Sequence, residues 1–313
     1  MKIAVVVPCY NEEALLQELL KRLSAVMAGC LGRREIDDYE LVFVDDASQD
    51  ATFSMLASAA AKDKKIKLVS LSRNCGHQVA ISAGLDYTQA EAVIVMDADL
   101  QDPPELIPEI IGAWRQGYKV VHMKRRVRKG EGFLKRAPAK MFYRLLNVFS
   151  TVKIPADTGD FKLLDKEVVV YLRRLKEQHR YLRGLVVLAG FNQTTLEYDR
   201  PCRFAGKPKY SFWKSLGLAS DGITSLSSRP LKVVTYLGVM GITCSVILAA
   251  YAIVSKFFLP QKALQGWTSL FIALTFFSGI QLLSLGLIGE YVGRIFEEVK
   301  NRPLYVVRQT VNI

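Results

Sequence analysis

The chain has 313 residues, of which 50% are hydrophobic, and its mean hydropathy is +0.16. This length allows a domain of roughly 200 residues with an appendage, and the apolar content indicates contact with a membrane. The formal net charge is +12, but the aromatic residues fall on apolar faces and two predicted spans anchor the chain to a membrane, so we expect no nucleic-acid partner.

The first 125 or so residues alternate short apolar runs with amphipathic segments. The expected strands are 3–7, 40–44, 66–71, 92–96 and 118–123, and the expected helices are 13–27, 50–61, 77–89 and 104–115. Continuous β-branched runs between helices predict an α/β fold with a mostly parallel, Rossmann-like sheet that is covered on both faces. Ligands of such sheets bind beyond the carboxyl ends of the strands.

Polar sequences follow the first four expected strands, and we expect them to share one rim. They are PCYNEE at 8–13, DDASQD at 45–50, SRNCGH at 72–77 and DADLQD at 97–102. The first of them lacks the glycines of a dinucleotide-binding turn, and the chain has no P-loop pattern. We therefore expect a phosphate on this rim to be held by a metal ion and basic side chains.

Two aspartates follow the second strand. Asp45 and Asp46 can accept hydrogen bonds from ribose hydroxyls or a base N–H. For Asp46, capping of the next helix fits equally well, and Ser48 and Asp50 are as well placed for that role. The three histidines, His77, His122 and His179, have no metal-site spacing, so we expect them on a helix surface, in a strand and in a loop.

The acidic pair Asp97 and Asp99 is the most informative part of the rim. Alternate side chains of an extended strand point the same way, so the two carboxylates can converge as the strand leaves the sheet. Gln101 adds a neutral oxygen two residues later. Such oxygen ligands suit Mg²⁺ or Mn²⁺, which keeps waters and substrate phosphates in its shell. A solvated acidic turn is the alternative.

A basic segment follows the fifth strand. Residues 124–136 carry seven basic side chains and one acidic one, as a solvated or lipid-facing surface does. From 133 to 149 apolar residues recur at helical spacing, which predicts an amphipathic helix at the membrane interface or, alternatively, a packed core helix. The segment 211–228 is a second candidate of this kind.

Two long uncharged stretches follow, between Lys232 and Lys256 and between Lys262 and Glu290. Each exceeds the roughly 20 residues that cross a bilayer. We therefore expect a hairpin of two transmembrane helices at about 233–254 and 268–289, within the region 231–290.

The short loop of this hairpin places a domain of residues 1–210, a juxtamembrane segment (211–230) and a tail (291–313) on one side of the membrane. Lysine and arginine flank the spans mainly on that side, which predicts that it is the cytoplasm. The N-terminal apolar run is too short for a secretory signal, and the odd number of cysteines without CxxC spacing indicates reduced thiols. Paired glycines in both spans leave a homo-oligomer open.

The rim sequences carry a family resemblance. Residues 5–13, 43–52, 71–86 and 95–105 resemble the family 2, GT-A fold glycosyltransferases. Residues 157–169, 180–185 and the two spans resemble the polyprenyl-phosphate glycosyltransferases, which include dolichyl-phosphate mannose synthases and bactoprenol glucosyltransferases. The resemblance covers essentially the whole chain. It implies an inner or plasma membrane hexosyltransferase that moves a sugar, with inversion, from a nucleotide diphosphate sugar to undecaprenyl or dolichyl phosphate.

The resemblance also implies roles for individual residues. Nucleotide or donor contacts would come from Pro8, Tyr10, Glu12, Asp45, Asp46 and Asp97, and the divalent metal, Mg²⁺ or Mn²⁺, would be held by Asp97, Asp99 and Gln101. Acceptor phosphate contacts would come from Arg125 and, as further candidates, Arg136, Arg200, Arg203 and Lys209, because arginine offers a fork to phosphate oxygens. Asp99 and Asp157 would be catalytic.

A general-base role for Asp157 meets a physical objection. A lipid monophosphate is already an anion near neutral pH, so it needs little deprotonation. Asp157 would then orient the acceptor, bind donor hydroxyls or take a proton from the lipid phosphate monoanion.

The donor is expected to be UDP-glucose by the same resemblance, although GDP-mannose or a modified pentose would use the same chemistry. An inactive nucleotide-sugar binding module is the alternative, and a processive polysaccharide synthase is disfavoured because Gln178 is followed by HRY instead of the QxxRW pattern.

Overall fold

The structure is a computed structural model, and it describes residues 1–126, 158–199, 229–258 and 266–313. Its strands are β1 (Lys2–Cys9), β2 (Asp38–Asp45), β3 (Ile66–Leu71), β4 (Ala92–Val95), β5 (Val120–Arg125), β6 (Thr158–Asp165), β7 (Gln193–Tyr198) and β8 (Val307–Val311). Its helices are α1 (Glu13–Gly32), α2 (Thr52–Lys62), α3 (His77–Asp86), the 3-10 helix η1 (Pro104–Leu106), α4 (Ile107–Arg115), α6 (Lys166–Arg174), α7 (Leu182–Leu188), α9 (Arg229–Phe258) and α10 (Trp267–Val299). The predicted interfacial helix at 133–149 and the segment 211–228 lie outside the described residues.

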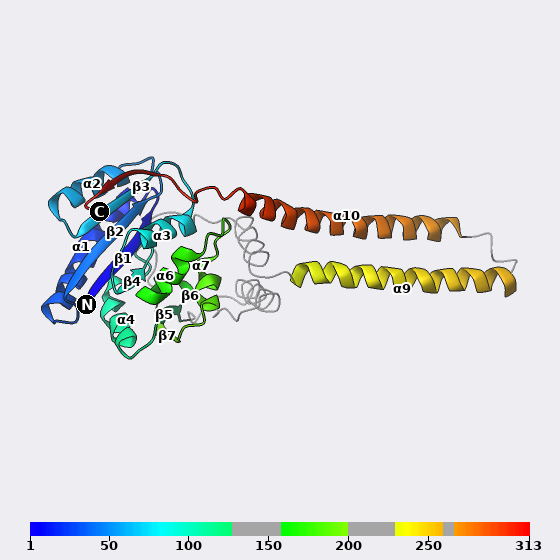
Figure 1. The fold of residues 1–313 in the computed structure, drawn as a ribbon, viewed down its shortest axis with the longest axis horizontal. Helices are drawn as coiled ribbons and strands as arrows, with labels where there is room; N and C mark the ends of the chain where they lie inside the picture. The colour runs from blue at the N-terminus through cyan, green and yellow to red at the C-terminus, as the bar shows by residue number, and fades with distance from the viewer. Residues whose placement is uncertain (127–157, 200–228, 259–265) are drawn as a thin grey trace.

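Eight strands of the described chain form one sheet in the order β7-β5-β6-β4-β1-β2-β3-β8 (Figure 1). Strands β1 to β4 are parallel, and β6 and β8 run against their neighbours. The predicted α/β fold with a mostly parallel sheet is therefore confirmed. From β1 the chain moves to β2 on one side, whereas β4 lies on the other side, so the strand order reverses between β1 and β4. Such a switch point is where open α/β sheets bind ligands.

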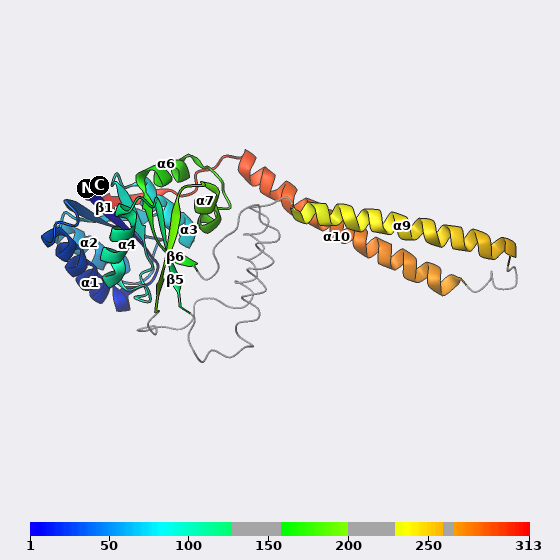
Figure 2. The ribbon, with the colours of Figure 1, turned by 90° about the horizontal axis from the view of Figure 1, so that it is seen from below.

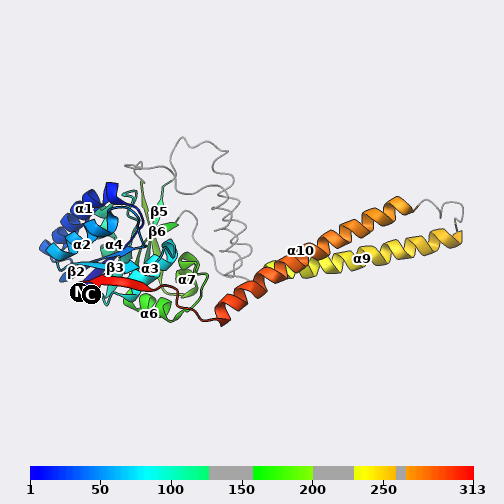
Figure 3. The same cartoon turned by 90° about the horizontal axis from the view of Figure 1, so that it is seen from above.

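Alternate residues of the central strands face two separate cores. Ile3, Val5 and Val7 of β1 pack with α1, α2 and α4 on one face, whereas Ala4 and Val6 pack with α3, α6 and α7 on the other. Figures 2 and 3 show these two helix layers on opposite faces of the sheet. Because both faces are covered, the central strands carry continuous apolar runs instead of an alternating pattern.

Helix α3 approaches the sheet closely at Gly84. A Cβ at this position would overlap Cγ1 of Val6 and would lie 3.1 Å from Cγ2 of Val44. We expect Gly84→Ala to lower the free energy of unfolding by about 2 kcal/mol, because the helix must move off the strands. Gly112→Ala in α4 is the matched control, since nothing lies within 4 Å of its Cβ position. Urea unfolding should show this control unchanged or more stable, and equal losses in both variants would contradict close packing of α3.

The end of the chain returns to the sheet. Strand β8 pairs antiparallel with β3 and covers that edge of the sheet, so residues 307–311 belong to the same structural unit as β1 to β7. The Asn312 amide donates to the carbonyls of Ala60 and Ile66 at 2.6 and 2.9 Å. The sequence interpretation described 291–313 only as a tail, because a five-residue strand without a neighbouring turn signal has no clear pattern.

Helices α9 and α10 project away from the sheet as an antiparallel pair (Figure 1). Within the described residues, one stretch, Phe276–Val299 of α10, is long and apolar enough to cross a membrane, and the apolar run found in α9, Val234–Cys244, is shorter. The last turns of α10 contact the loop after α6, where the Gln178 backbone N–H donates to Glu298 at 2.7 Å.

Candidate active site

The four predicted rim sequences meet at one edge of the sheet, because β1 to β4 are parallel neighbours. Each of the four loops contains a residue with positive φ: Asn11 (54°), Ala47 (56°), Gly76 (93°) and Leu100 (56°). Glycine and asparagine tolerate this conformation, but Ala47 and Leu100 do so at a steric cost. Backbone strain of this kind clusters at functional sites, so the rim is the candidate active site.

Loops from the first two strands are bonded to each other. The Asn11 backbone N–H donates to Ser48 Oγ at 3.1 Å, and Asn11 Oδ1 accepts the Gln49 backbone N–H at 2.8 Å. The Glu12 backbone N–H donates to Thr52 Oγ1 at 2.9 Å. These bonds fix the backbone on both sides of the partly exposed Tyr10 and Glu12, the residues that the sequence assigns to the nucleotide.

Pro8 lies in β1 beside the end of β4. Val6 accepts a hydrogen bond from the Met96 backbone N–H at 3.2 Å, so Val6 faces β4. Pro8 faces the same way, two residues further on, where β4 has already ended at Val95. The missing N–H of proline is therefore tolerated in a central strand, and it marks the point at which β1 and β4 diverge.

Asp45 and Asp46 are both buried but have different partners. Asp45 accepts Ser70 Oγ at 3.0 Å and the Ser48 backbone N–H at 3.1 Å. Asp46 accepts the backbone N–H groups of Cys75 and Gly76 at 2.7 and 2.9 Å, so it holds the loop before α3. Burial raises the pKa of Asp46, and the charge of Asp45 raises it further, against the two backbone bonds.

The first backbone N–H of α2 is bonded by Asp50 and not by Asp46, for which capping of this helix was the alternative role. Asp50 Oδ1 accepts the Thr52 backbone N–H at 3.0 Å at the start of that helix, and Asp50 Oδ2 accepts the Glu13 backbone N–H at 3.3 Å. The carboxylate of Asp46 points instead toward the loop that leads to His77. Asp46 thus joins the second and third loops of the rim.

Asp97, Asp99 and Gln101 follow β4 in a turn. The strand ends at Val95, one residue before its predicted end, and Asp99 Oδ1 accepts the Gln101 backbone N–H at 3.1 Å within this turn. Burial raises the pKa of Asp97, and the charges of Asp160 and Asp99 raise it further. Asp97 Oδ1 is buried and accepts no hydrogen bond from the part of the chain that the structure describes.

His77 lies in this site and not on an outer helix surface, so that expectation is wrong. Its Nε2 atom is 3.3 Å from Asp97 Oδ1 and 3.3 Å from Asp160 Oδ2. Burial lowers the pKa of His77, but Asp160 and Asp97 together raise it above its usual value. Helix α3 begins at His77, directly after Gly76, so the positive φ of that glycine aims the first side chain of the helix across the rim. His122 and His179 do lie in a strand and a loop, as expected.

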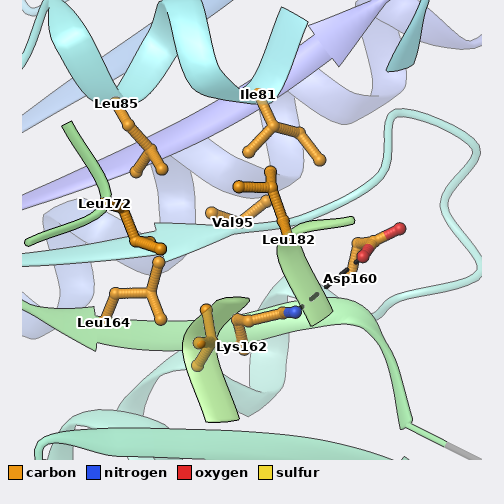
Figure 4. Close-up of a pocket in the computed structure, with 9 residues that line it drawn as sticks. Ile81, Leu85, Val95, Asp160, Lys162, Leu164, Leu172 and Leu182 are labelled. Atoms are coloured by element: carbon orange, nitrogen blue, oxygen red, sulfur yellow. Dashed lines mark ion pairs between the residues drawn. The ribbon is translucent and has the colours of Figure 1, made fainter. Parts of the chain in front are cut away.

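Asp160 is the most heavily paired carboxylate of the site. It accepts Arg183 Nε and Nη2, both at 2.9 Å, and lies 3.8 Å from Lys162 Nζ (Figure 4). Burial opposes its ionisation, but Arg183, His77 and Lys162 together hold its pKa well below the usual range. Lys162 projects beside a small, mainly apolar cavity, and burial lowers its pKa to about 8.

Arg125, the predicted phosphate ligand, lies at the end of β5. Its Nε donates to Tyr198 Oη at 3.4 Å, and its Nη2 is 3.9 Å from Asp102 Oδ1. The charges of Arg125 and Asp97 act on each other, because Asp97 raises the pKa of Arg125 and Arg125 lowers that of Asp97. The structure thus brings this guanidinium to the acidic part of the rim. Asp157, Arg136, Arg200, Arg203 and Lys209 lie outside the described residues.

A divalent cation fits the acidic part of the rim by its donor chemistry. Asp97 and Asp99 provide carboxylate oxygens, Gln101 provides an amide oxygen, and the buried Asp97 Oδ1 has unused acceptor capacity among the described residues. The described residues contain no cluster of three or more His, Cys, Asp or Glu side chains arranged for a metal ion. A site with two carboxylates suits a hard cation that takes its other ligands from water and phosphate.

Comparison with known proteins identifies the family. Glycosyl transferase family 2 matches residues 4–172, the span that contains the whole rim. The chain belongs to glycosyl transferase family 2. This glycosyltransferase is 46% identical to the uncharacterized glycosyltransferase YkcC of Bacillus subtilis over 99% of the chain and 94% of YkcC. It is 39% identical to the bactoprenol glucosyl transferase of Shigella phage SfII over 99% of the chain and 98% of that protein.

Two solved structures are also similar to the glycosyltransferase. TarS 1–349 of S. aureus with UDP-GlcNAc has a TM-score of 0.44 at 19% identity and covers 72% of this chain and 67% of that one. Glucosyl-3-phosphoglycerate synthase of Mycobacterium tuberculosis with Mn²⁺, UDP and glucosyl-3-phosphoglycerate has a TM-score of 0.45 at 19% identity and covers 72% and 78%. The family rests on the sequence matches, and with it the GT-A fold that the sequence resemblance implied is confirmed.

Proposed function

We propose that this glycosyltransferase moves a sugar from a nucleotide diphosphate sugar to the phosphate of a membrane polyprenol, with inversion at the anomeric carbon. The observation that carries the proposal is the 39% identity to a bactoprenol glucosyl transferase over 99% of the chain. The rim supports it, because acidic and basic side chains that suit a diphosphate, a metal and a phosphate lie at the switch point of the sheet. UDP-glucose is the proposed donor.

The donor side of the rim is proposed to comprise the loops after β1, β2 and β4. Pro8, Tyr10, Glu12 and Asp45 would contact the nucleotide, whose ribose hydroxyls a carboxylate accepts well. Asp46 would keep the Cys75–Gly76 backbone in place beside it. The hydrogen bonds between the first two loops give these residues a fixed geometry before the donor arrives.

Asp97, Asp99 and Gln101 would hold Mg²⁺ or Mn²⁺. When bound, the cation would supply positive charge near the departing nucleoside diphosphate. His77 and Asp160 would fix Asp97 from the protein side, since the imidazole lies 3.3 Å from both carboxylates. Arg183 and Lys162 would in turn keep Asp160 ionised. This chain of contacts would hold Asp97 in place.

The acceptor phosphate is proposed to bind Arg125, with Arg136, Arg200, Arg203 and Lys209 as further contacts and Asp157 orienting the acceptor. Two spans would anchor the enzyme in an inner or plasma membrane with its catalytic domain and both termini in the cytoplasm. Support comes from the apolar stretch in α10 and from the pairing of α9 with α10. Because the end of α10 contacts the loop at Gln178, the proposed membrane helix is in direct contact with the domain that contains the sheet.

Product analysis tests this proposal. Full-length protein in detergent would be incubated with undecaprenyl phosphate, Mn²⁺ or Mg²⁺, and a panel of nucleotide sugars that includes UDP-glucose and GDP-mannose. We expect mass spectrometry to detect a polyprenyl-phosphate sugar that requires the cation and disappears with a chelator. Failure of every donor to give a glycolipid would contradict the hypothesis that the protein is an active enzyme. It would favour the alternative, an inactive nucleotide-sugar binding module.

A further inference from the structure

Asp102 is a buried carboxylate that the proposed donor and metal contacts do not use. It follows the acidic turn by one residue after Gln101, but its side chain is 0% exposed and points into the protein. Its Oδ1 accepts Tyr198 Oη at 2.6 Å and lies 3.9 Å from Arg125 Nη2. A buried carboxylate is costly unless it is hydrogen-bonded and paired with a cation. Asp102 meets both conditions through these two residues.

Tyr198 completes this contact from the neighbouring strand. It is directly opposite Arg125 in the parallel pairing of β5 with β7, and it is 4% exposed. Its ring packs edge-on against Phe161, with 6.0 Å between the ring centroids. Burial raises the pKa of Tyr198, and Asp102 raises it further. The phenol therefore stays protonated and donates a hydrogen bond to Asp102.

Gly159 of β6 leaves room for the guanidinium. A Cβ at this position would be 2.9 Å from Arg125 Nη2. The Arg125 side chain, which comes from β5, is therefore surrounded by residues of three other segments. These residues are Gly159 of β6, Tyr198 of β7 and Asp102 of the loop after β4. The guanidinium is still 30% exposed, and its contacts with Asp102 and Tyr198 are long for an arginine fork. The Arg125 guanidinium can therefore still donate hydrogen bonds to an anionic oxygen of a ligand.

We propose that Asp102 and Tyr198 are positioning residues that hold Arg125 where it binds the phosphate of the lipid acceptor. The proposal rests on the proposed function, which assigns that phosphate to Arg125. The ligand of Arg125 is a phosphate oxygen, which either the lipid acceptor or the donor diphosphate can supply. The acceptor is favoured because Arg125 ends β5, which β6 separates from β4, whereas the proposed diphosphate contacts follow β4 and the proposed nucleotide contacts lie at the ends of β1 and β2, further away.

The test is a binding measurement that does not depend on sugar transfer. Full-length protein in mixed micelles would be titrated with undecaprenyl phosphate and, separately, with UDP and Mn²⁺. We expect Asp102→Asn and Tyr198→Phe to weaken lipid-phosphate binding by about tenfold and about threefold, because a misplaced arginine loses a charge-assisted hydrogen bond. The dissociation constant for UDP should stay within about twofold, the usual scatter between independent sites.

A double-mutant cycle separates positioning from a general structural effect. In an Arg125→Gln background, Asp102→Asn should cause no further loss of lipid-phosphate affinity, since it acts through the guanidinium. Gly159→Ala, which removes no polar group, should weaken binding in the wild type and not in Arg125→Gln. The matched control is the pair Tyr305 and Asp86, joined at 2.8 Å at the far end of α3. Tyr305→Phe and Asp86→Asn should leave both affinities unchanged.

Each outcome decides the proposal. Additive losses in the cycle, unchanged lipid binding in Asp102→Asn and Tyr198→Phe, or a loss confined to UDP would overturn it, as would a wild type that does not bind undecaprenyl phosphate. If Asp102→Asn fails to fold, Tyr198→Phe and Gly159→Ala carry the same test. A wild type that binds the lipid phosphate and shows the expected cycle, yet forms no glycolipid, would leave this inference standing while the transfer reaction fails.

Discussion

The Asp97→Asn variant is expected to lose glycosyl transfer by about a thousandfold, because the rim loses one of the two carboxylates that are proposed to hold the divalent cation. The loss should appear in kcat/KM at saturating Mn²⁺, measured with undecaprenyl phosphate and UDP-glucose. The fold should survive. Burial, Asp160 and Asp99 all raise the pKa of Asp97, so a neutral amide removes a charge that the folded state disfavours.

Two controls belong to this measurement. Asp37→Asn changes a 79% exposed carboxylate before β2 and should keep full activity. Calorimetry should show that Asp97→Asn binds Mn²⁺ with UDP much more weakly than the wild type, while its melting temperature is equal or higher. An Asp97→Asn protein that retains wild-type activity would remove the acidic turn from the mechanism, and a variant that melts early would make the activity loss a folding effect.

The Asp160→Ala variant should lose about 3 kcal/mol of unfolding free energy, because it removes the carboxylate that faces the buried Lys162 and the partly buried Arg183. Urea titration at neutral pH measures this loss. The wild-type contribution is present above the ordinary aspartate pKa of 3.8 and is lost as the pH falls through the lower folded-state value. Activity should fall as well, since His77 loses one of its two anchors.

An exposed ion pair provides the matched control for Asp160→Ala. Glu105 pairs with Arg22 at 2.6 Å, but it is 53% exposed, so Glu105→Ala should cost less than about 1 kcal/mol. Lys162→Met in the Asp160→Ala background should restore part of the lost stability, because the flexible apolar side chain suits the cavity beside Leu164 and Leu172. Equal effects of Asp160→Ala and Glu105→Ala would show that the buried network contributes no more than a surface pair.

The sequence was sufficient to predict strands β1 to β5 of the sheet and its rim, but not β6, β7 or β8. Continuous apolar runs identified the parallel strands, and the parallel geometry then required the loops at Asn11, Ala47, Gly76 and Leu100 to meet at one edge. The bounds of β3, 66–71, were predicted without error. Boundaries at strand ends were less accurate, because β4 stops at Val95 where the apolar run continues to Met96.

Contacts between residues that are far apart in the chain could not be predicted from the sequence pattern. His77 and Asp160 are 83 positions apart, and only the packing of α3 on β1 and β2, in the sheet that also holds β6, brings them within 3.3 Å. Arg183 reaches Asp160 from α7 in the same way. The motifs at 157–169 and 180–185 did contain Asp160 and Arg183, so the signal was present, but nothing in their spacing pairs them. Strand β8 was missed because its partner β3 lies more than 200 residues earlier.

Anomalous scattering from Mn²⁺ in crystals of the full-length protein with UDP is the most direct test of the central claim, that the loop after β4 holds the cation of a nucleotide diphosphate site. The account predicts a manganese peak in direct contact with Asp97 and Asp99, with the diphosphate beside it and the nucleoside over the loops after β1 and β2. A peak elsewhere in the molecule, or UDP bound on this rim with no manganese at Asp97 and Asp99, would contradict it.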